Sequence, residues 1–253
     1  MPGDAASMAV EQISYHAAGK RFVGALVYDK RVSGKRPLLL VSPNWLGVTE
    51  DAIKRTQMLA GSRFVGFVAD MYGDGKVSAG PPEAGELADA LRADAKERRL
   101  RISAALSALI SESEKRGIGD MSRKAAVGFC FGGGNVLELA RAGADVQAVV
   151  SLHGDLTSPI AAKPGDIKAA LLVVHGAADP VAPKAQRDAF ENEMEAAKAS
   201  WQMLTFGHLL HSFCEPEANV PGIAEYNEPA ARQTYRLIDQ FVADAFEGRI
   251  VKT

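Results

Sequence analysis

The chain has 253 residues, 47% of them hydrophobic, and its 29 basic and 31 acidic residues give a formal net charge of −2. The hydrophobic fraction is enough for a substantial core, and the near-neutral charge excludes the strongly basic proteins that bind nucleic acids or acidic membranes. Two cysteines are too few for a disulfide framework or a cysteine-rich metal site.

No apolar run reaches the roughly 18 residues that a membrane-spanning helix needs. The first seven residues also lack the basic and apolar regions of a secretory signal. We therefore expect a cytoplasmic protein with no membrane or nucleic-acid partner, either a monomer or a homodimer. Residues 1–9 are expected to form a disordered leader, and residues 10–253 a single domain.

Strand and helix signals alternate along the chain, with no linker, repeat or low-complexity segment. Apolar or strand-like runs predict strands at Val23–Tyr28, Leu38–Val41, Phe64–Ala69, Lys124–Val127, Val146–Leu152, Ala170–Val174 and Trp201–Phe206. A helix is predicted to begin after a cap region at Thr49. The segment Glu83–Arg116 is predicted to be helical, with a break near Ala93–Asp94. Further helices are predicted at Asn135–Arg141, Lys184–Lys198 and Pro229–Ala245. The segment 207–226 is predicted to be a long loop.

The alternation predicts an α/β fold, a mostly parallel, doubly wound sheet of about seven to eight strands with helices on both faces. Within the long helical segment, the Arg98–Arg99 and Glu112–Glu114 clusters are expected to face solvent.

The segment Gly128-Phe129-Cys130-Phe131-Gly132 lies between a predicted strand and a predicted helix. This arrangement is typical of a nucleophile elbow, a tight turn that exposes a reactive side chain and needs small neighbours where backbone segments crowd together. The start of the helix directs its N–H groups and its positive dipole end toward the nucleophile, which favours a thiolate. The alternative is a buried, inert cysteine in a glycine-rich turn.

A thiol nucleophile needs a base, and the base needs an acceptor that holds its tautomer. Asp179 follows a late strand and His211 lies in the final loop, so nucleophile, acid and histidine occur in the order found in α/β-hydrolases. Asp179 could instead be a turn residue before a proline, and His208 is a rival base. His153 and His175 end apolar strands and are interpreted as structural histidines.

The oxyanion hole is expected to take the backbone N–H of Phe131 and a second one from Trp45, with Leu46 as the next candidate. The substrate pocket is expected to include Asn44, Leu46, Tyr72 and Cys214. Trp45 and Tyr72 could wall an apolar pocket or simply pack in the core. Cys214 could lie near the pocket or be a buried, inert thiol. We expect no metal and no cofactor, because the H-E-x-x-H, Walker A and G-x-G-x-x-G patterns are all missing.

These residues resemble the dienelactone hydrolase family of the α/β-hydrolase fold. The matching segments are Gly128–Gly133, Ala69–Gly73, Gly176–Pro180, His211–Phe213 and Tyr226–Arg232, within a similarity that runs from about residue 15 to 246. The resemblance implies that Cys130 is the nucleophile, His211 the base and Asp179 its partner, and that the substrates are lactones or esters.

The chain departs from this family at two places. Members that open dienelactones carry a glutamate in the loop after the central strand, where this chain has Asn44, and an arginine just past the His-Ser-Phe segment, where this chain has Cys214-Glu215. Since Glu215 would repel an anion, we expect a small neutral ester or lactone, and neutral phosphotriesters as further substrates. Asp70 and Asp155 are candidates to replace the missing glutamate. The alternative function is a non-catalytic, redox-responsive or ligand-binding relative, in which Cys130 could pair with Cys214.

Overall fold

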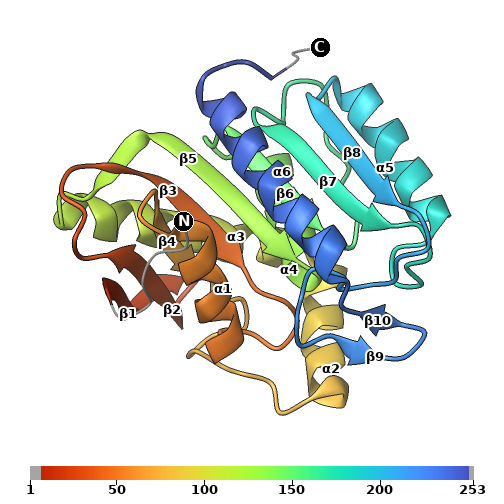
Figure 1. Ribbon diagram of the computed structural model, residues 1–253, viewed down its shortest axis with the longest axis horizontal. Helices are drawn as coiled ribbons and strands as arrows, with labels where there is room; N and C mark the ends of the chain where they lie inside the picture. The colour runs from red at the N-terminus through yellow and green to blue at the C-terminus, as the bar shows by residue number, and fades with distance from the viewer. Residues whose placement is uncertain (1–6, 251–253) are drawn as a thin grey trace. The chain divides into compact units, whose positions relative to one another are not determined.

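The computed structural model describes residues 7–250, which divide into two compact units at the Ala126–Val127 bond (Figure 1). Most of the expected leader, residues 1–6, lies outside the described residues. Met8 and Ala9 already belong to the first strand, β1 (Met8–Ala17), so ordered structure begins before the expected domain start at residue 10.

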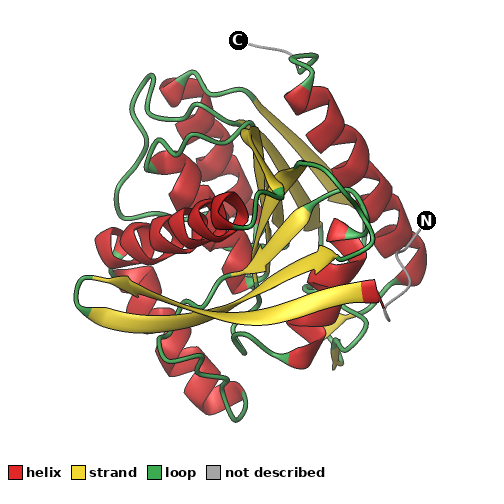
Figure 2. Ribbon diagram, turned by 90° about the vertical axis from the view of Figure 1, so that its left-hand side faces the viewer, coloured by secondary structure: helices red, strands yellow, loops and turns green. Residues whose placement is uncertain are grey.

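The strands of the first unit follow the order β1-β2-β4-β3-β5. β1 pairs antiparallel with β2 (Lys20–Asp29), and Figure 2 shows the two as a long twisted ribbon. β2 pairs antiparallel with β4 (Val65–Val68), which pairs parallel with β3 (Arg36–Ser42). The four residues Leu38–Val41 of β3 are at most 2% exposed, as expected of a strand that is covered on both faces.

Helix ends in the first unit follow their capping residues. The helix α1 (Glu50–Ala60) begins after Thr49, whose hydroxyl accepts the N–H of Ala52 at 3.1 Å. Asp94 ends α2 (Pro81–Ala93) and caps α3 (Ala95–Lys115), where its carboxylate accepts the N–H of Glu97 at 3.0 Å. The predicted break near Ala93–Asp94 is therefore confirmed.

One prediction for α3 is wrong. Arg98 is 1% exposed, although its cluster was expected to face solvent. Its spacing from Ile102, Ala105 and Leu109 places it on the same face of α3 as these fully buried residues. The apolar periodicity of the helix therefore determines the burial of Arg98, and the charge of the side chain does not override it.

β5 (Gly119–Phe129) crosses the boundary between the units. In the second unit it is followed in the strand order by β6 (Ala148–Leu152), β7 (Ala170–Gly176) and β8 (Trp201–Phe206). β6 pairs parallel with β7, and β7 pairs parallel with β8. α6 packs along β6 and β7 (Figure 1). The elements after β5 are α4 (Phe131–Arg141), β6 (Ala148–Leu152), β7 (Ala170–Gly176), α5 (Lys184–Ala197), β8 (Trp201–Phe206), β9 (Asn219–Val220), β10 (Ala224–Glu225) and α6 (Glu228–Phe246).

The two orders together contain eight strands, most of them in parallel pairs, which confirms the α/β class. The expected long loop at residues 207–226 holds a short hairpin made of β9 and β10. Within residues 7–250, no helix is both long and apolar enough to cross a bilayer.

Candidate active site

Cys130 occupies a strained turn between β5 and α4. It is the N-cap residue of α4, with φ 52° and ψ −121°, and a positive φ is uncommon for a residue with a side chain. Such strain persists only where the surrounding structure holds it. The backbone therefore forms the tight strand–turn–helix of the predicted elbow.

Glycines make this turn possible because the backbone segments around it nearly touch. A Cβ atom at Gly128 would clash with the carbonyl oxygen of Gly132. A Cβ atom at Gly133 would lie 2.7 Å from the Cα atom of Gly154 and 2.7 Å from the hydroxyl oxygen of Ser151. Both glycines are thus required by close approach, and Gly128 is one of the two glycines of the predicted elbow pattern.

The second unit brings together the three residues that the sequence pattern singled out. The Nε2 atom of His211 lies 3.0 Å from the Sγ atom of Cys130. On the other side of the ring, Nδ1 lies 2.9 Å from Oδ2 of Asp179. All three side chains are at least 92% buried, so each contact is made with little competition from water.

Asp179 is held by its own backbone turn as well as by the histidine. Its Oδ1 atom accepts the N–H groups of Val181 at 2.8 Å and Ala182 at 3.2 Å, which leaves Oδ2 to the ring of His211. The expected turn role and the expected partner role are therefore filled by different oxygens of one carboxylate.

The loop that carries His211 is fixed at two points. Gly176, at the end of β7, lies so close to the carbonyl of Leu209 that a Cβ atom would clash with it, and Ala178 donates its N–H to the same carbonyl at 3.0 Å. Further on, His211 donates its N–H to Ile223 at 3.0 Å and forms a bridge with Ala224 of β10. The acid turn and the hairpin together hold the backbone of the histidine.

Electrostatics in this cluster favour a charged histidine. Burial alone would lower the pKa of His211, but its charge interaction with Cys130 and the hydrogen bonds that its ring donates to Asp179 and Cys130 outweigh it and raise the pKa to about 10. Burial would likewise raise the pKa of Asp179, yet its hydrogen bond and charge interaction with His211 lower it. The geometry is thus suited to a thiolate–imidazolium pair backed by a carboxylate.

Phe131 follows Cys130 as the first residue of α4. Its backbone N–H therefore belongs to the first turn, at the positive end of the helix dipole. This is the position that the elbow pattern predicts for one donor of an oxyanion hole.

Four of the other predicted site residues, Asn44, Trp45, Leu46 and Tyr72, belong to the first unit, where hydrogen bonds join them in two pairs. The hydroxyl of Tyr72 donates to the carbonyl of Trp45 at 2.8 Å, and Leu46 donates its N–H to the side-chain oxygen of Asn44 at 3.0 Å. The side chain of Asn44 thus stabilises its own turn. The assignment of these four residues to the oxyanion hole and pocket stays a prediction.

Cys214 and Glu215, three and four positions after His211, are both buried. Cys214 is fully buried, its carbonyl accepts the hydroxyl of Tyr235 at 3.0 Å, and both cysteines are free thiols. Glu215 is 2% exposed and accepts the hydroxyl of Ser212 at 3.1 Å. Its carboxylate therefore takes part in the internal hydrogen bonding of the histidine loop.

His153 is the residue near the nucleophile that sequence reasoning missed. Its Nδ1 atom accepts the backbone N–H of Cys130 at 3.1 Å, and its ring packs edge to face with that of His211, with centroids 5.3 Å apart. The sequence feature that could have identified His153 is its position directly after a buried strand, at the edge of the sheet where sites form in α/β proteins. His175 holds a similar position, and its Nδ1 atom lies 3.9 Å from Oδ2 of Asp179.

Asp70, a candidate for the missing glutamate, organises a turn of the first unit. Its carboxylate accepts four backbone N–H groups at 2.8–2.9 Å, from Val23, Tyr72, Gly73 and Gly75. Because its carboxylate is used to hold these backbone groups, Asp70 has a structural role. Asp155, the other candidate, is 6% exposed.

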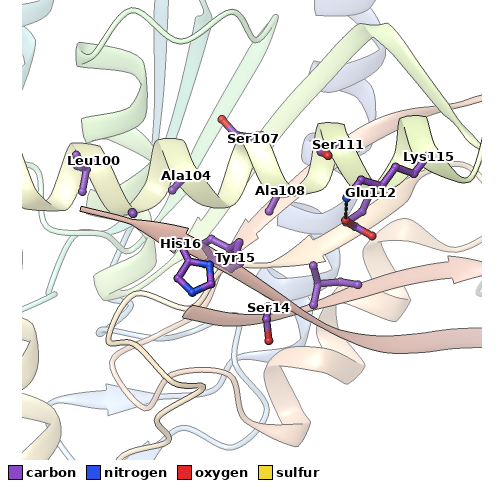
Figure 3. Close-up of a pocket in the computed structure, with 12 residues that line it drawn as sticks. Ser14, Tyr15, His16, Leu100, Ala104, Ser107, Ala108, Ser111, Glu112 and Lys115 are labelled. Atoms are coloured by element: carbon purple, nitrogen blue, oxygen red, sulfur yellow. Dashed lines mark hydrogen bonds and ion pairs between the residues drawn. The ribbon is translucent and has the colours of Figure 1, made fainter. Parts of the chain in front are cut away.

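The first unit also contains an open groove of about 500 Å³ between β1 and α3 (Figure 3). Ser14 and His16 line it from the strand, and Ser107 and Ser111 line it from the helix. It includes none of the three clustered residues of the second unit. Across residues 7–250, no group of three or more His, Cys, Asp or Glu side chains could hold a metal ion.

Comparison with known proteins identifies the family of this chain. Residues 23–246 match the model of the dienelactone hydrolase family. The chain is 34% identical over 151 residues to the uncharacterized protein K02A2.1 of Caenorhabditis elegans, an alignment that covers 58% of this chain and 92% of the relative.

Solved structures of dienelactone hydrolase-like proteins are similar to this chain. A protein named m3DLH is 31% identical, with a TM-score of 0.85 over 97% of this chain and 100% of the other. The dienelactone hydrolase-like promiscuous phosphotriesterase P91 from metagenomic libraries is 32% identical, with a TM-score of 0.84 over 94% of this chain and 99% of the other. A dienelactone hydrolase-like protein of Klebsiella pneumoniae, at 20% identity and a TM-score of 0.77 over 93% and 98% of the two chains, shows the same fold. The predicted fold is confirmed.

Proposed function

The chain belongs to the dienelactone hydrolase family and is a hydrolase; on this premise, we propose that it cleaves small neutral carboxylic esters or lactones with Cys130 as the nucleophile. The observation that carries the proposal is the hydrogen-bonded line from Cys130 through His211 to Asp179, with distances of 3.0 and 2.9 Å. A nucleophile, a base and an acceptor that orients the base are what covalent hydrolysis requires.

In the proposed reaction, Nε2 of His211 holds the proton that came from the thiol, and the thiolate sulfur of Cys130 attacks the ester carbonyl carbon. The tetrahedral intermediate places its negative oxygen on the backbone N–H of Phe131, at the start of α4. It collapses with cleavage of the carbon–oxygen bond, and His211 returns the proton to the leaving alcohol or, in a lactone, to the freed hydroxyl.

The second half of the reaction regenerates the thiol. His211 takes a proton from water, and the resulting hydroxide attacks the thioester carbonyl carbon. Cleavage of the carbon–sulfur bond then releases the carboxylic acid and Cys130. Throughout, Asp179 holds Nδ1 of the ring and stabilises the imidazolium. No step requires a cofactor or a metal.

We further propose that neutral phosphotriesters enter the same site. The support comes from the similarity to P91, a promiscuous phosphotriesterase that is 32% identical over most of this chain. A phosphotriester without a negative charge also avoids repulsion by a thiolate nucleophile. In this reaction the sulfur of Cys130 attacks phosphorus, the P–O bond to the leaving alcohol or phenol breaks, and His211 gives that oxygen its proton. Water, deprotonated by His211, then attacks phosphorus, and cleavage of the P–S bond releases the phosphodiester and Cys130.

The test is hydrolysis of a p-nitrophenyl ester and of a neutral p-nitrophenyl phosphotriester by the wild type and by Cys130→Ala. We expect both activities in the wild type and the loss of both in the variant. Cys214→Ala, which removes the other thiol, is the matched control and should keep them. Hydrolysis that persists in Cys130→Ala would refute the mechanism. A wild type that hydrolyses neither substrate, while iodoacetamide still modifies Cys130, would favour the redox or ligand-binding alternative.

A cytoplasmic location stays a prediction.

A further inference from the structure

The ring of His153 makes a direct hydrogen bond to the backbone of the nucleophile. His153 follows β6 and is fully buried. The N–H of Cys130 is shared between Nδ1 of His153, at 3.1 Å, and the carbonyl of Leu152, at 3.0 Å. Two acceptors from the end of one strand thus hold the peptide group that enters the elbow.

This hydrogen bond acts where the backbone is strained. Cys130 has φ 52° and His153 itself has φ 39°, both in the left-handed region that side chains disfavour. The orientation of the peptide before Cys130, together with its φ and ψ, sets the direction of the sulfur and of the Phe131 N–H. An acceptor that fixes this peptide therefore controls the nucleophile and one oxyanion donor together.

The contact also determines the protonation state of His153. Because the backbone N–H of Cys130 can only donate, Nδ1 must carry a lone pair, and the proton of the neutral ring is on Nε2. The groups that face the ring include the imidazole of His211, the rings of Phe129 and Phe213, and the carboxylate of Glu215, whose Oε1 lies 4.0 Å from Nδ1. A neutral ring next to His211 also avoids repulsion when His211 carries the proton.

We propose that His153 is a positioning residue, which acts through its Nδ1 acceptor to hold Cys130 and the Phe131 N–H in the reactive geometry. The proposal rests on the hydrolase mechanism given above, in which Cys130 is the nucleophile. It predicts that an acceptor atom at the place of Nδ1 is needed for activity, and that the imidazole as such is not.

Three substitutions separate this role from simple packing. In His153→Asn, the side-chain oxygen can occupy the place of Nδ1, because both atoms are bonded to Cγ. In His153→Gln, the polar atoms lie one bond further out, near the place of Nε2. His153→Leu fills part of the same space without any acceptor. A role in packing alone would not distinguish Asn from Gln in this way.

The measurements are kcat and KM for a p-nitrophenyl ester, and the rate at which iodoacetamide modifies Cys130, followed by mass spectrometry of the peptide that contains it. We expect His153→Leu and His153→Gln to lower kcat and the alkylation rate by about 10- to 100-fold, with KM changed by less than about threefold. His153→Asn should recover most of both rates. Equal rates in all three variants would overturn the proposal. If His153→Leu does not fold, the comparison of Asn with Gln decides alone.

Alkylation needs no substrate, so the two proposals can fail separately. If the wild type hydrolyses no ester, the order of the alkylation rates still tests the role of His153. If Cys130→Ala abolishes hydrolysis but the Asn and Gln variants behave alike, the hydrolase mechanism stands and the positioning role is refuted.

Discussion

The Nε2 atom of His211 lies 3.0 Å from the sulfur of Cys130, although the two residues are 81 positions apart in the chain. The contact joins the turn after β5 to the loop before α6, and both belong to the second unit. Because Asp179 holds the opposite nitrogen of the same ring, His211 is oriented from both sides.

Asp179→Asn should lower kcat/KM for a p-nitrophenyl ester by on the order of 10²–10⁴-fold, since an amide cannot stabilise the imidazolium and can favour the wrong tautomer of His211. The fold should persist, because Oδ1 can still accept the N–H groups of Val181 and Ala182. The control is Asp188→Asn on the exposed face of α5, where the carboxylate pairs with Lys184. Equal activity of Asp179→Asn and the wild type would exclude the proposed role of Asp179.

His211→Gln should abolish detectable ester hydrolysis and slow the alkylation of Cys130, because the substitution removes both the base and the positive partner of the thiolate. His208→Gln is the matched control, since His208 was the rival base in the same loop and its side chain is exposed. We expect this control to keep at least half of the wild-type kcat. The opposite pattern would assign the base to His208.

Gly128→Ala should destabilise the protein by about 3 kcal/mol or more, because the added methyl group meets the backbone carbonyl of Gly132 and neither segment can move independently. Gly207→Ala is the control, since a Cβ atom there meets nothing within 4 Å. Urea denaturation of both variants measures the difference. A Gly128→Ala variant as stable as the control would mean that the elbow can relax.

His175→Leu should make the protein less sensitive to acid. Burial lowers the pKa of His175 from 6.5 to about 4, so the folded state favours the neutral ring. The resulting stabilisation is fully present above pH 6.5 and is lost as the pH falls through about 4. The wild type should therefore lose up to about 3 kcal/mol relative to His175→Leu over this range.

At pH 7 the two proteins should be similar in stability, because neither ring nitrogen of His175 has a hydrogen-bond partner. Urea denaturation at several pH values between 7 and 4 gives the comparison, with His16→Gln as an exposed control. Parallel loss of stability in the wild type and His175→Leu would contradict the expectation.

Most of the secondary structure and the turn at Cys130 can be predicted from local sequence. The spacing of apolar runs predicted the strands and their alternation with helices, Thr49 and Asp94 predicted where helices begin and break, and the glycines around Cys130 predicted the elbow. These features depend on neighbours within a few residues, where side-chain chemistry restricts the backbone directly. The chain order of Cys130, Asp179 and His211 added the candidate triad.

Tertiary structure decided the features that depend on distant segments. Only packing of β6 against the elbow brings His153 to the N–H of Cys130, so the histidine could not be told from an ordinary buried one. Arg98 was misjudged because its charge favoured solvent while its place on the buried face of α3 favoured the core. Glu215 is buried because the histidine loop folds on itself around Ser212. A local pattern records which residue types are adjacent, but the environment of a side chain is determined by all the segments that pack around it.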